Sequence, residues 1–286
     1  MPVDVWGVFE PGPGVHTIVF EGRSGETLVF DLRARELGSK ASVHLTLTDS
    51  GGHPLDSAAS FDGKPDPLLA HRFDADGQYR IELREETMAC SEDNYFRLTL
   101  GALPFVTDVY PLVVRDQESV QLVGYNLDSE ASVSVPPGAG RRRDIAVDPD
   151  HYWSRRKFPI AVESWLVARE QEPNDEPETA FGTQVPGSVA GHVDANGTFD
   201  TDLVSFEAVQ GKTYIVETEA SALGSPIDTR IDLLNDRGEP VPRVRLQSVR
   251  DSSITFRAIS SGAGGARLVN TDEMQLNDLL YMNGEV

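Results

Sequence analysis

Short stretches in which apolar and polar residues alternate run along most of the sequence. Each is five to nine residues long and rich in Val, Ile, Thr, Tyr and Phe, which is typical of strands that bury one face. In the first half these are HTIVFEG (16–22), ETLVFDLRA (26–34), VHLTLTD (43–49), QYRIELR (78–84) and YFRLTLG (95–101). Further on they are VQLVGY (120–125), ASVSV (131–135), LVSFEAV (203–209), TYIVETEA (213–220) and TRIDLLN (229–235).

Turn sequences punctuate these segments. DSGG (49–52), DADG (74–77) and NDRG (235–238) carry the Gly, Asp and Asn residues that tight turns favour, at the spacing of a β-sandwich. Long amphipathic helix patterns are absent, and MQLNDLLYM (274–282) is open to either a short helix or a strand. The pattern therefore predicts an all-β protein.

The sequence contains an internal repeat. Residues 20–55 align without a gap with residues 206–241, and 11 of the 36 aligned positions are identical. The identities fall at turn glycines, such as Gly25 with Gly211, and at the Leu-Gly-Ser triplet that begins at Leu37 and at Leu223. Glycines are required where the backbone geometry is demanding, so the pattern of identities indicates one domain present twice.

The repeated unit resembles the bacterial pre-peptidase C-terminal domain, a β-sandwich appended to secreted peptidases. In the second copy the resemblance covers EPND (172–175), the Val189-x-Gly191 turn, Asp200-x-Asp202-x-x-x-Phe206 and LGSP (223–226) followed by Asp228. In the first copy it covers DGxY (76–79) and YFRL (95–98). After Pro240 the second copy departs from the pattern, which indicates a truncation or an insertion.

The stretch between the copies has its own short segments in which apolar and polar residues alternate. Val109-x-Pro111 and LVGYNL (122–127) resemble the opening of an immunoglobulin-like domain of the IPT/TIG type. We therefore expect two jelly-roll-like β-sandwich domains, at 1–103 and 169–286, flanking a smaller immunoglobulin-like β-sandwich at 104–168.

Composition excludes several classes of function. The net charge of −21 gives nucleic-acid phosphates no electrostatic partner, so nucleic acid is not an expected ligand. No apolar run approaches the roughly 18–20 residues that span a bilayer, and residues 1–14 lack the features of a signal peptide. The single cysteine, Cys90, excludes an intrachain disulfide, and it is expected to be a half-buried small side chain.

The acidic run EQEPND (170–175) is a candidate calcium site. Calcium takes six to eight oxygen ligands, and Glu170, Glu172 and Asn174 stand at alternate positions that an extended chain turns to one side. The predicted ligands are Glu170, Glu172, Asn174, Asp175, Asp200 and Asp202. Related collagen-binding modules bind calcium through such a segment, and the resemblance implies the same here.

The first copy serves as an internal control for this site. Gly14 and His16 stand where Asp200 and Asp202 stand in the second copy, and no EPND segment precedes them. Acids required by the fold alone would be present in both copies. The other reading, a solvated acidic linker between modules, stays open.

Catalytic motifs are absent, since HExxH, GxSxG and GxxxxGK[ST] do not occur. We expect a non-catalytic targeting, adhesion or spacer module of a larger bacterial protein, with calcium stabilising a domain junction. The resemblance implies an extracellular or cell-surface location, with other domains of the parent chain as partners. The alternative is an accessory module that holds an extracellular polysaccharide or fibrous protein for a secreted hydrolase; an intrinsic hydrolase ranks last.

One basic and aromatic cluster stands out in this acidic sequence. Arg141–Arg143 and Arg155–Lys157 lie close to Tyr152 and Trp153. These residues either lie in exposed loops or contact an acidic surface, which belongs to a partner or to a neighbouring domain of the same chain. Trp6, Trp153 and Trp165 would stack on sugars if exposed, and otherwise pack in a core or a domain junction.

Overall fold

The computed structural model describes residues 2–10, 14–87, 91–193, 200–227 and 229–241. The described residues form an all-β fold with two short 3₁₀ helices, as expected. Two compact units are present. Unit 1 comprises residues 1–109, 121–133 and 146–157, and unit 2 comprises residues 110–120, 134–145 and 158–286. The three predicted domains, with boundaries at 103 and 168, stay a prediction.

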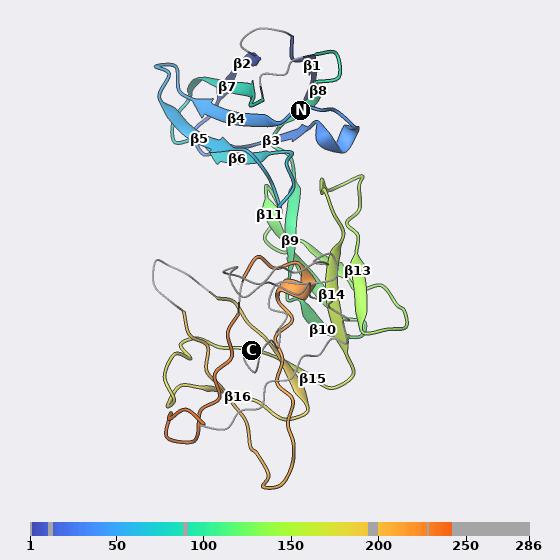
Figure 1. The fold of residues 1–286 in the computed structure, drawn as a ribbon, viewed down its shortest axis with the longest axis vertical. Helices are drawn as coiled ribbons and strands as arrows, with labels where there is room; N and C mark the ends of the chain where they lie inside the picture. Colours follow the sequence, from blue (N-terminus) through green and yellow to red (C-terminus); the bar gives the residue numbers. More distant parts are fainter. Residues whose placement is uncertain (1, 11–13, 88–90, 194–199, 228, 242–286) are drawn as a thin grey trace, which may run out of the picture. The chain divides into compact units, whose positions relative to one another are not determined.

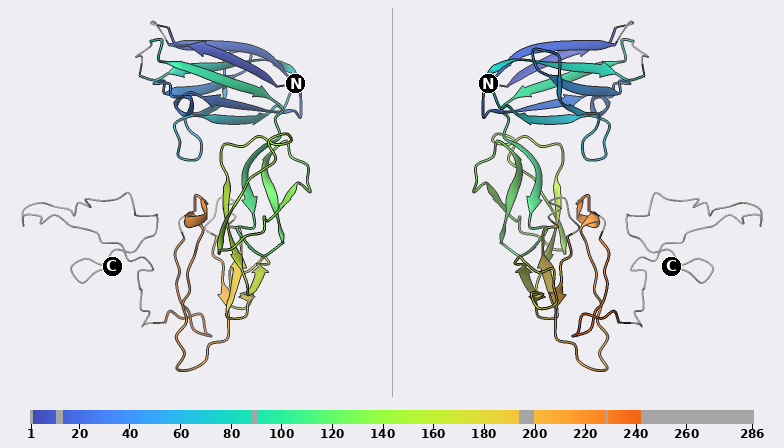
Figure 2. Two further views of the ribbon diagram at one scale, coloured as in Figure 1. Left: turned by 90° about the vertical axis from the view of Figure 1, so that its right-hand side faces the viewer. Right: turned by 90° about the vertical axis from the view of Figure 1, so that its left-hand side faces the viewer.

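A β-sandwich of two four-stranded antiparallel sheets forms the N-terminal part of unit 1 (Figures 1 and 2). The sheets have the orders β1-β8-β3-β6 and β2-β7-β4-β5. Their strands are β1 (Val3–Val8), β2 (Val15–Gly22), β3 (Thr27–Arg33), β4 (Val43–Thr48), β5 (Pro54–Ala58), β6 (Leu68–Arg72), β7 (Gly77–Glu85) and β8 (Tyr95–Gly101).

Alternating residues of these strands fill the sandwich core. In β4, Val43, Leu45 and Leu47 are buried and the residues between them are half-buried, as the period-two pattern predicts. Phe30 and Phe73 are also fully buried in this core, within one cluster that draws on both sheets. Interdigitating inner faces of this kind are the main source of stability in a sandwich.

The remaining strands are shorter. They are β9 (Phe105–Tyr110), β10 (Val113–Arg115), β11 (Ser119–Tyr125), β12 (Ser132–Ser134), β13 (Arg142–Ile145), β14 (Phe158–Glu163), β15 (Leu166–Arg169), β16 (Phe181–Gly182), β17 (Gly187–Ala190) and β18 (Val204–Ser205). They form sheets of order β12-β11-β9 and β10-β14-β13 and the parallel pairs β15-β17 and β16-β18.

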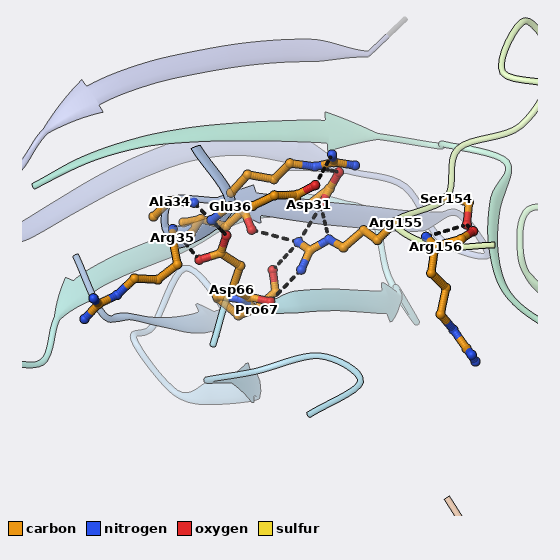
Figure 3. A network of polar contacts seen from close by, with 11 residues as sticks. Asp31, Ala34, Arg35, Glu36, Asp66, Pro67, Ser154, Arg155 and Arg156 are labelled. Atoms are coloured by element: carbon orange, nitrogen blue, oxygen red, sulfur yellow. Dashed lines mark hydrogen bonds and ion pairs between the residues drawn. The ribbon is translucent and has the colours of Figure 1, made fainter. Parts of the chain in front are cut away.

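Part of the basic cluster is buried against the first sandwich (Figure 3). Arg155 donates from Nε to Asp31 Oδ1 at 2.7 Å and from Nη2 to the carbonyls of Leu32 and Pro67 at 2.7 and 2.8 Å. Its Nη1 donates to the carbonyl of Asp66 at 2.5 Å. Asp31 and the Arg155 side chain are 0% and 5% exposed. Of the two readings of the cluster, contact with an acidic group holds for Arg155.

The Asp66 carboxylate satisfies the start of the first 3₁₀ helix, η1 (Arg35–Leu37). It accepts the N–H groups of Ala34, Arg35 and Glu36 at 3.0, 2.8 and 2.9 Å. Because such amides otherwise lack partners, Asp66 and Arg155 together fix the loop that leaves β3.

The turns of residues 20–55 recur 186 residues later. The second 3₁₀ helix, η2 (Ser221–Leu223), lies at the positions that correspond to η1. Both helices end at a left-handed glycine, Gly38 with φ 87° and Gly224 with φ 85°. The two stretches therefore share local backbone geometry, whereas the proposal of two complete copies of one domain stays a prediction.

The second stretch exposes residues whose first-stretch counterparts are buried. Ile215 is 84% exposed, whereas its counterpart Val29 is fully buried. Leu233 is exposed, whereas its counterpart Leu47 is fully buried. The strands predicted at 213–220 and 229–235 are absent from the described residues of those ranges, apart from an isolated bridge at Leu234. A β-strand requires a hydrogen-bonded neighbouring strand, and these two segments have none among the described residues beyond that bridge.

Several predictions fall outside the described residues. In the register of the repeat, residues 68–100 correspond to residues 254–286, and the predicted truncation or insertion lies in that region. Cys90, Asp228 and the segment 274–282 are also outside the described residues. Among the residues that are described, no helix is long and apolar enough to cross a membrane.

Candidate functional site: an acidic cluster beside β15 and β17

Glu170 follows directly after β15, and the parallel partner strand β17 holds it in place. Its N–H donates to the carbonyl of Ala190 at 3.0 Å, which extends the β15–β17 pairing by one residue. Its carboxylate turns back to accept the N–H of His192 through Oε1. Between these two anchors lies Gly191, where a β-carbon would collide with the Glu170 carboxylate. A residue without a side chain therefore lets the carboxylate lie against the backbone.

Asn174 links the acidic run to the segment that carries Asp202. Its backbone N–H donates to Glu172 Oε2 at 2.9 Å, and its Nδ2 donates to Glu170 Oε2 at 3.4 Å. Its carbonyl accepts the N–H of Leu203 at 3.1 Å. This last bond brings Asp202 next to an acidic run that lies almost thirty residues earlier in the sequence.

Three carboxylates converge as a result. One oxygen from each of Glu170, Glu172 and Asp202 lies within 4.8 Å of the other two. Hard cations such as calcium and magnesium take their ligands from carboxylate, amide and backbone oxygens. The donor set contains oxygen and no sulfur, so it fits a hard divalent cation.

Burial and mutual repulsion both act on the carboxylates of this cluster. Loss of hydration, and then the negative charges of Glu170, Asp200 and Glu172, raise the pKa of Asp202 to about 6. A hydrogen bond from Asn174 opposes this shift. A raised carboxyl pKa means that the folded state holds the negative charge at a cost, and a bound cation would remove that cost.

Asn174 gives a second and independent sign of a missing partner. Its side chain is 0% exposed, and its Oδ1 has no hydrogen-bond partner among the described residues. Leaving a buried polar atom unpaired costs about 1–3 kcal/mol. The amide oxygen is a good ligand for calcium, and half a turn of the amide would exchange Oδ1 with the Nδ2 that now faces the carboxylates.

The structure therefore assembles part of the predicted ligand set. Glu170, Glu172 and Asp202 form the cluster, and Asn174 contacts it. Asp200 acts on the cluster through its charge, and Asp175 is exposed and lies outside the three-carboxylate group. The roles of Asp175 and Asp200 as ligands stay predictions.

Two neighbours of the site had no functional signal in the sequence. The His192 ring packs on the Tyr110 ring with centroids 4.2 Å apart, beside the amide that binds Glu170. Burial, and then the charge of Glu170, raise the pKa of Tyr110. The family pattern predicts a turn at Gly191, and its contact with Glu170 gives this residue a more specific role.

Among the described residues, no such cluster forms at the corresponding position of the first stretch of the repeat. His16 stands where Asp202 stands, its Nε2 bonds to the Val8 carbonyl at 2.9 Å, and its ring packs on Phe9 and Phe96. The equivalent position in that copy is thus part of an aromatic contact.

Comparison with known proteins adds one likeness. No family model matches the chain, and no curated protein matches it. One similar solved structure is the pre-peptidase C-terminal domain of collagenase from Bacillus anthracis, at 8% identity. The match covers 35% of this chain and 88% of that domain, with a TM-score of 0.29. A likeness this distant carries no argument.

Alanine at position 191 is expected to weaken cation binding without unfolding the protein. The new methyl group would push the flexible Glu170 carboxylate out of the cluster, and the backbone there lies outside the left-handed region that disfavours alanine. We expect calcium affinity to fall by roughly tenfold or more, in line with changes that misplace metal ligands. The control is Gly182→Ala, whose β-carbon would meet only Ser205 Oγ at 3.8 Å. Equal affinities in the two variants would show that Glu170 is not a ligand.

Stability without divalent cations is expected to fall between pH 4 and about pH 6.5. The pKa of Asp202 is higher in the folded state than its ordinary 3.8, so the fold binds this proton more tightly than the unfolded chain. The stabilisation is complete below about pH 4 and disappears as pH rises through about 6. Thermal melts in chelator, with wild type compared with Asp202→Asn, measure it. A wild-type minus variant difference that stays constant with pH would contradict the assignment.

Proposed function

We propose that this chain is a non-catalytic spacer or adhesion segment of a larger bacterial protein, acting outside the cell. Glu170, Glu172, Asn174 and Asp202 hold a calcium ion in it. The observation that supports the cation is the convergence of three carboxylates beside the buried Asn174 amide, whose Oδ1 has no hydrogen-bond partner among the described residues. The tandem pre-peptidase C-terminal and immunoglobulin-like organisation predicted from the sequence belongs to the same proposal.

Calcium suits the donor set better than magnesium. Magnesium demands near-ideal octahedral geometry and keeps several waters, whereas calcium accepts irregular sets of six to eight oxygens. The carboxylates of Glu170 and Glu172 come from residues two apart in one segment, and Asp202 comes from another. Water and backbone carbonyls would complete the shell.

The role of the ion is mechanical. A cation bound by Glu170 and Asp202 joins the segment that leaves β15 to the segment that enters β18. It offsets the loss of hydration and the repulsion that together raise the pKa of Asp202, and it stiffens the entry to the last module. Stiff modules in series hold distant parts of a surface protein at a fixed separation.

Hydrogen exchange measured by mass spectrometry tests the proposal locally. Calcium is expected to slow exchange at the amides of Asn174, His192 and Leu203 by at least about tenfold relative to chelator, because ligand binding stabilises the closed state. Magnesium at the same concentration is expected to do less. Unchanged exchange at these three amides in calcium would reject the site.

A further inference from the structure

An exposed tryptophan stands on the outer face of the first sandwich. Trp6 lies on β1, the edge strand of its sheet, and is 63% exposed, the most exposed of the three tryptophans of the chain. In register beside it is Arg97 of β8, and beside that is Arg33 of β3. These three side chains form a row across the face of the sheet. The sequence left open whether Trp6 is exposed or packed, and the structure shows it exposed.

Among the described residues, Arg97 lacks both a hydrogen-bond partner for its buried Nε and an ion-pair partner for its guanidinium. In the described part of the chain, the buried Nε of Arg97 and that of Arg143 make no hydrogen bond. Arg143 nevertheless pairs with Asp116 through its Nη1. Arg97 has no ion pair with any described carboxylate, although the chain carries a net charge of −21. Its guanidinium carbon lies 5.8 Å from the centre of the Trp6 ring.

Nearby acids are already engaged. Arg33, the neighbour of Arg97 across the sheet, is paired with Asp31 and Glu36. Asp4, two residues before Trp6, accepts a hydrogen bond from Thr99 at 2.5 Å. The unpaired positive charge therefore sits beside a flat aromatic surface that is open to solvent.

We propose that Trp6 and Arg97 form a binding subsite for the uronic-acid units of an acidic polysaccharide. An indole face packs against the C–H face of a sugar ring, and a guanidinium binds a carboxylate through two parallel hydrogen bonds. A uronic acid carries both features on one ring. The subsite is independent of the cation cluster, which belongs to the other compact unit.

A polysaccharide fits this surface better than an acidic protein. One tryptophan and one arginine on an open sheet lack the desolvated central cluster that gives protein partners their affinity. A polysaccharide presents the same unit many times, so a weak subsite gains strength whenever several copies of the protein are held together.

The test compares probes that differ in one feature. Binding of the full chain to polygalacturonate, alginate and hyaluronate is measured at low salt by calorimetry and tryptophan fluorescence, with methyl-esterified polygalacturonate and polyglutamate alongside. We expect at least tenfold tighter binding to one or more of the acidic polysaccharides than to the esterified polymer or to polyglutamate. The esterified polymer keeps the sugar face, and polyglutamate keeps the carboxylates.

Variants separate the two contributions. Arg97→Gln is expected to abolish the preference for the acid over its ester, and Trp6→Ala is expected to abolish binding to both. Arg84→Gln and Trp165→Phe, which change an exposed arginine and an exposed tryptophan elsewhere, should bind like wild type. Circular dichroism confirms that each variant is folded. Three results would overturn the proposal: no binding to any acidic polysaccharide, equal binding to polyglutamate, or wild-type binding by Trp6→Ala.

Discussion

Replacing Arg155 with methionine is expected to lower the free energy of unfolding of unit 1 by about 3–5 kcal/mol. The substitution leaves Asp31 fully buried with only Arg33 Nε, at 3.1 Å, as a charged partner. It also removes the donor to the carbonyls of Leu32, Asp66 and Pro67. Because Arg33 remains, the lower end of the range is the expected value. Urea denaturation followed by circular dichroism measures the change.

A matched control distinguishes burial from charge. Arg84→Met breaks an exposed pair with Glu82 and is expected to change stability by less than about 1 kcal/mol. The double variant Asp31→Asn with Arg155→Met should lose less stability than the sum of the two single changes, since the residues share one network. If Arg155→Met were as mild as Arg84→Met, the network in Figure 3 would not anchor the loop that carries Arg155.

Asparagine at position 202 is expected to have opposite effects in chelator and in calcium. In chelator it removes a repelled negative charge, so the protein should melt at a higher temperature than wild type above pH 6. In calcium at about 1,000 times the dissociation constant, wild type should gain about 4.1 kcal/mol, and the variant should gain almost none. Wild type would then be the more stable of the two.

The matched control for this reversal is Glu178→Gln. Glu178 belongs to the same acidic run but is exposed and lies outside the three-carboxylate group. It should keep the full calcium response. If Asp202→Asn lowered the melting temperature equally in chelator and in calcium, Asp202 would have a structural role rather than a charge that an ion neutralises.

The fold class was predictable because the signals are local. Alternation in segments such as 43–49 marks one buried face, and the structure buries Val43, Leu45 and Leu47 as the pattern requires. The paired turns at Gly38 and Gly224 were predictable for the same reason, since left-handed backbone favours glycine. The same alternation at 213–220 predicted a strand, but the described residues there pair with no neighbouring strand. Alternation cannot predict this, because strand pairing depends on residues that are distant in the sequence.

The candidate site was predictable only in part. Alternate spacing brought Glu170 and Glu172 to one side, and the repeat singled out Asp202, whose counterpart is His16. The role of Gly191 depends on a carboxylate folding back over the backbone, which leaves no trace in composition or spacing. The partner of Arg155 was equally hidden, since Asp31 lies 124 residues away in the sequence.

Calorimetric titration of the full chain with calcium at pH 7.5, after removal of divalent cations, tests the central claim most directly. The account predicts saturable heat for one site in wild type and in Glu178→Gln, and no such heat in Asp202→Asn. Absence of heat in wild type together with an unchanged melting temperature, or the same heat in Asp202→Asn, would contradict it.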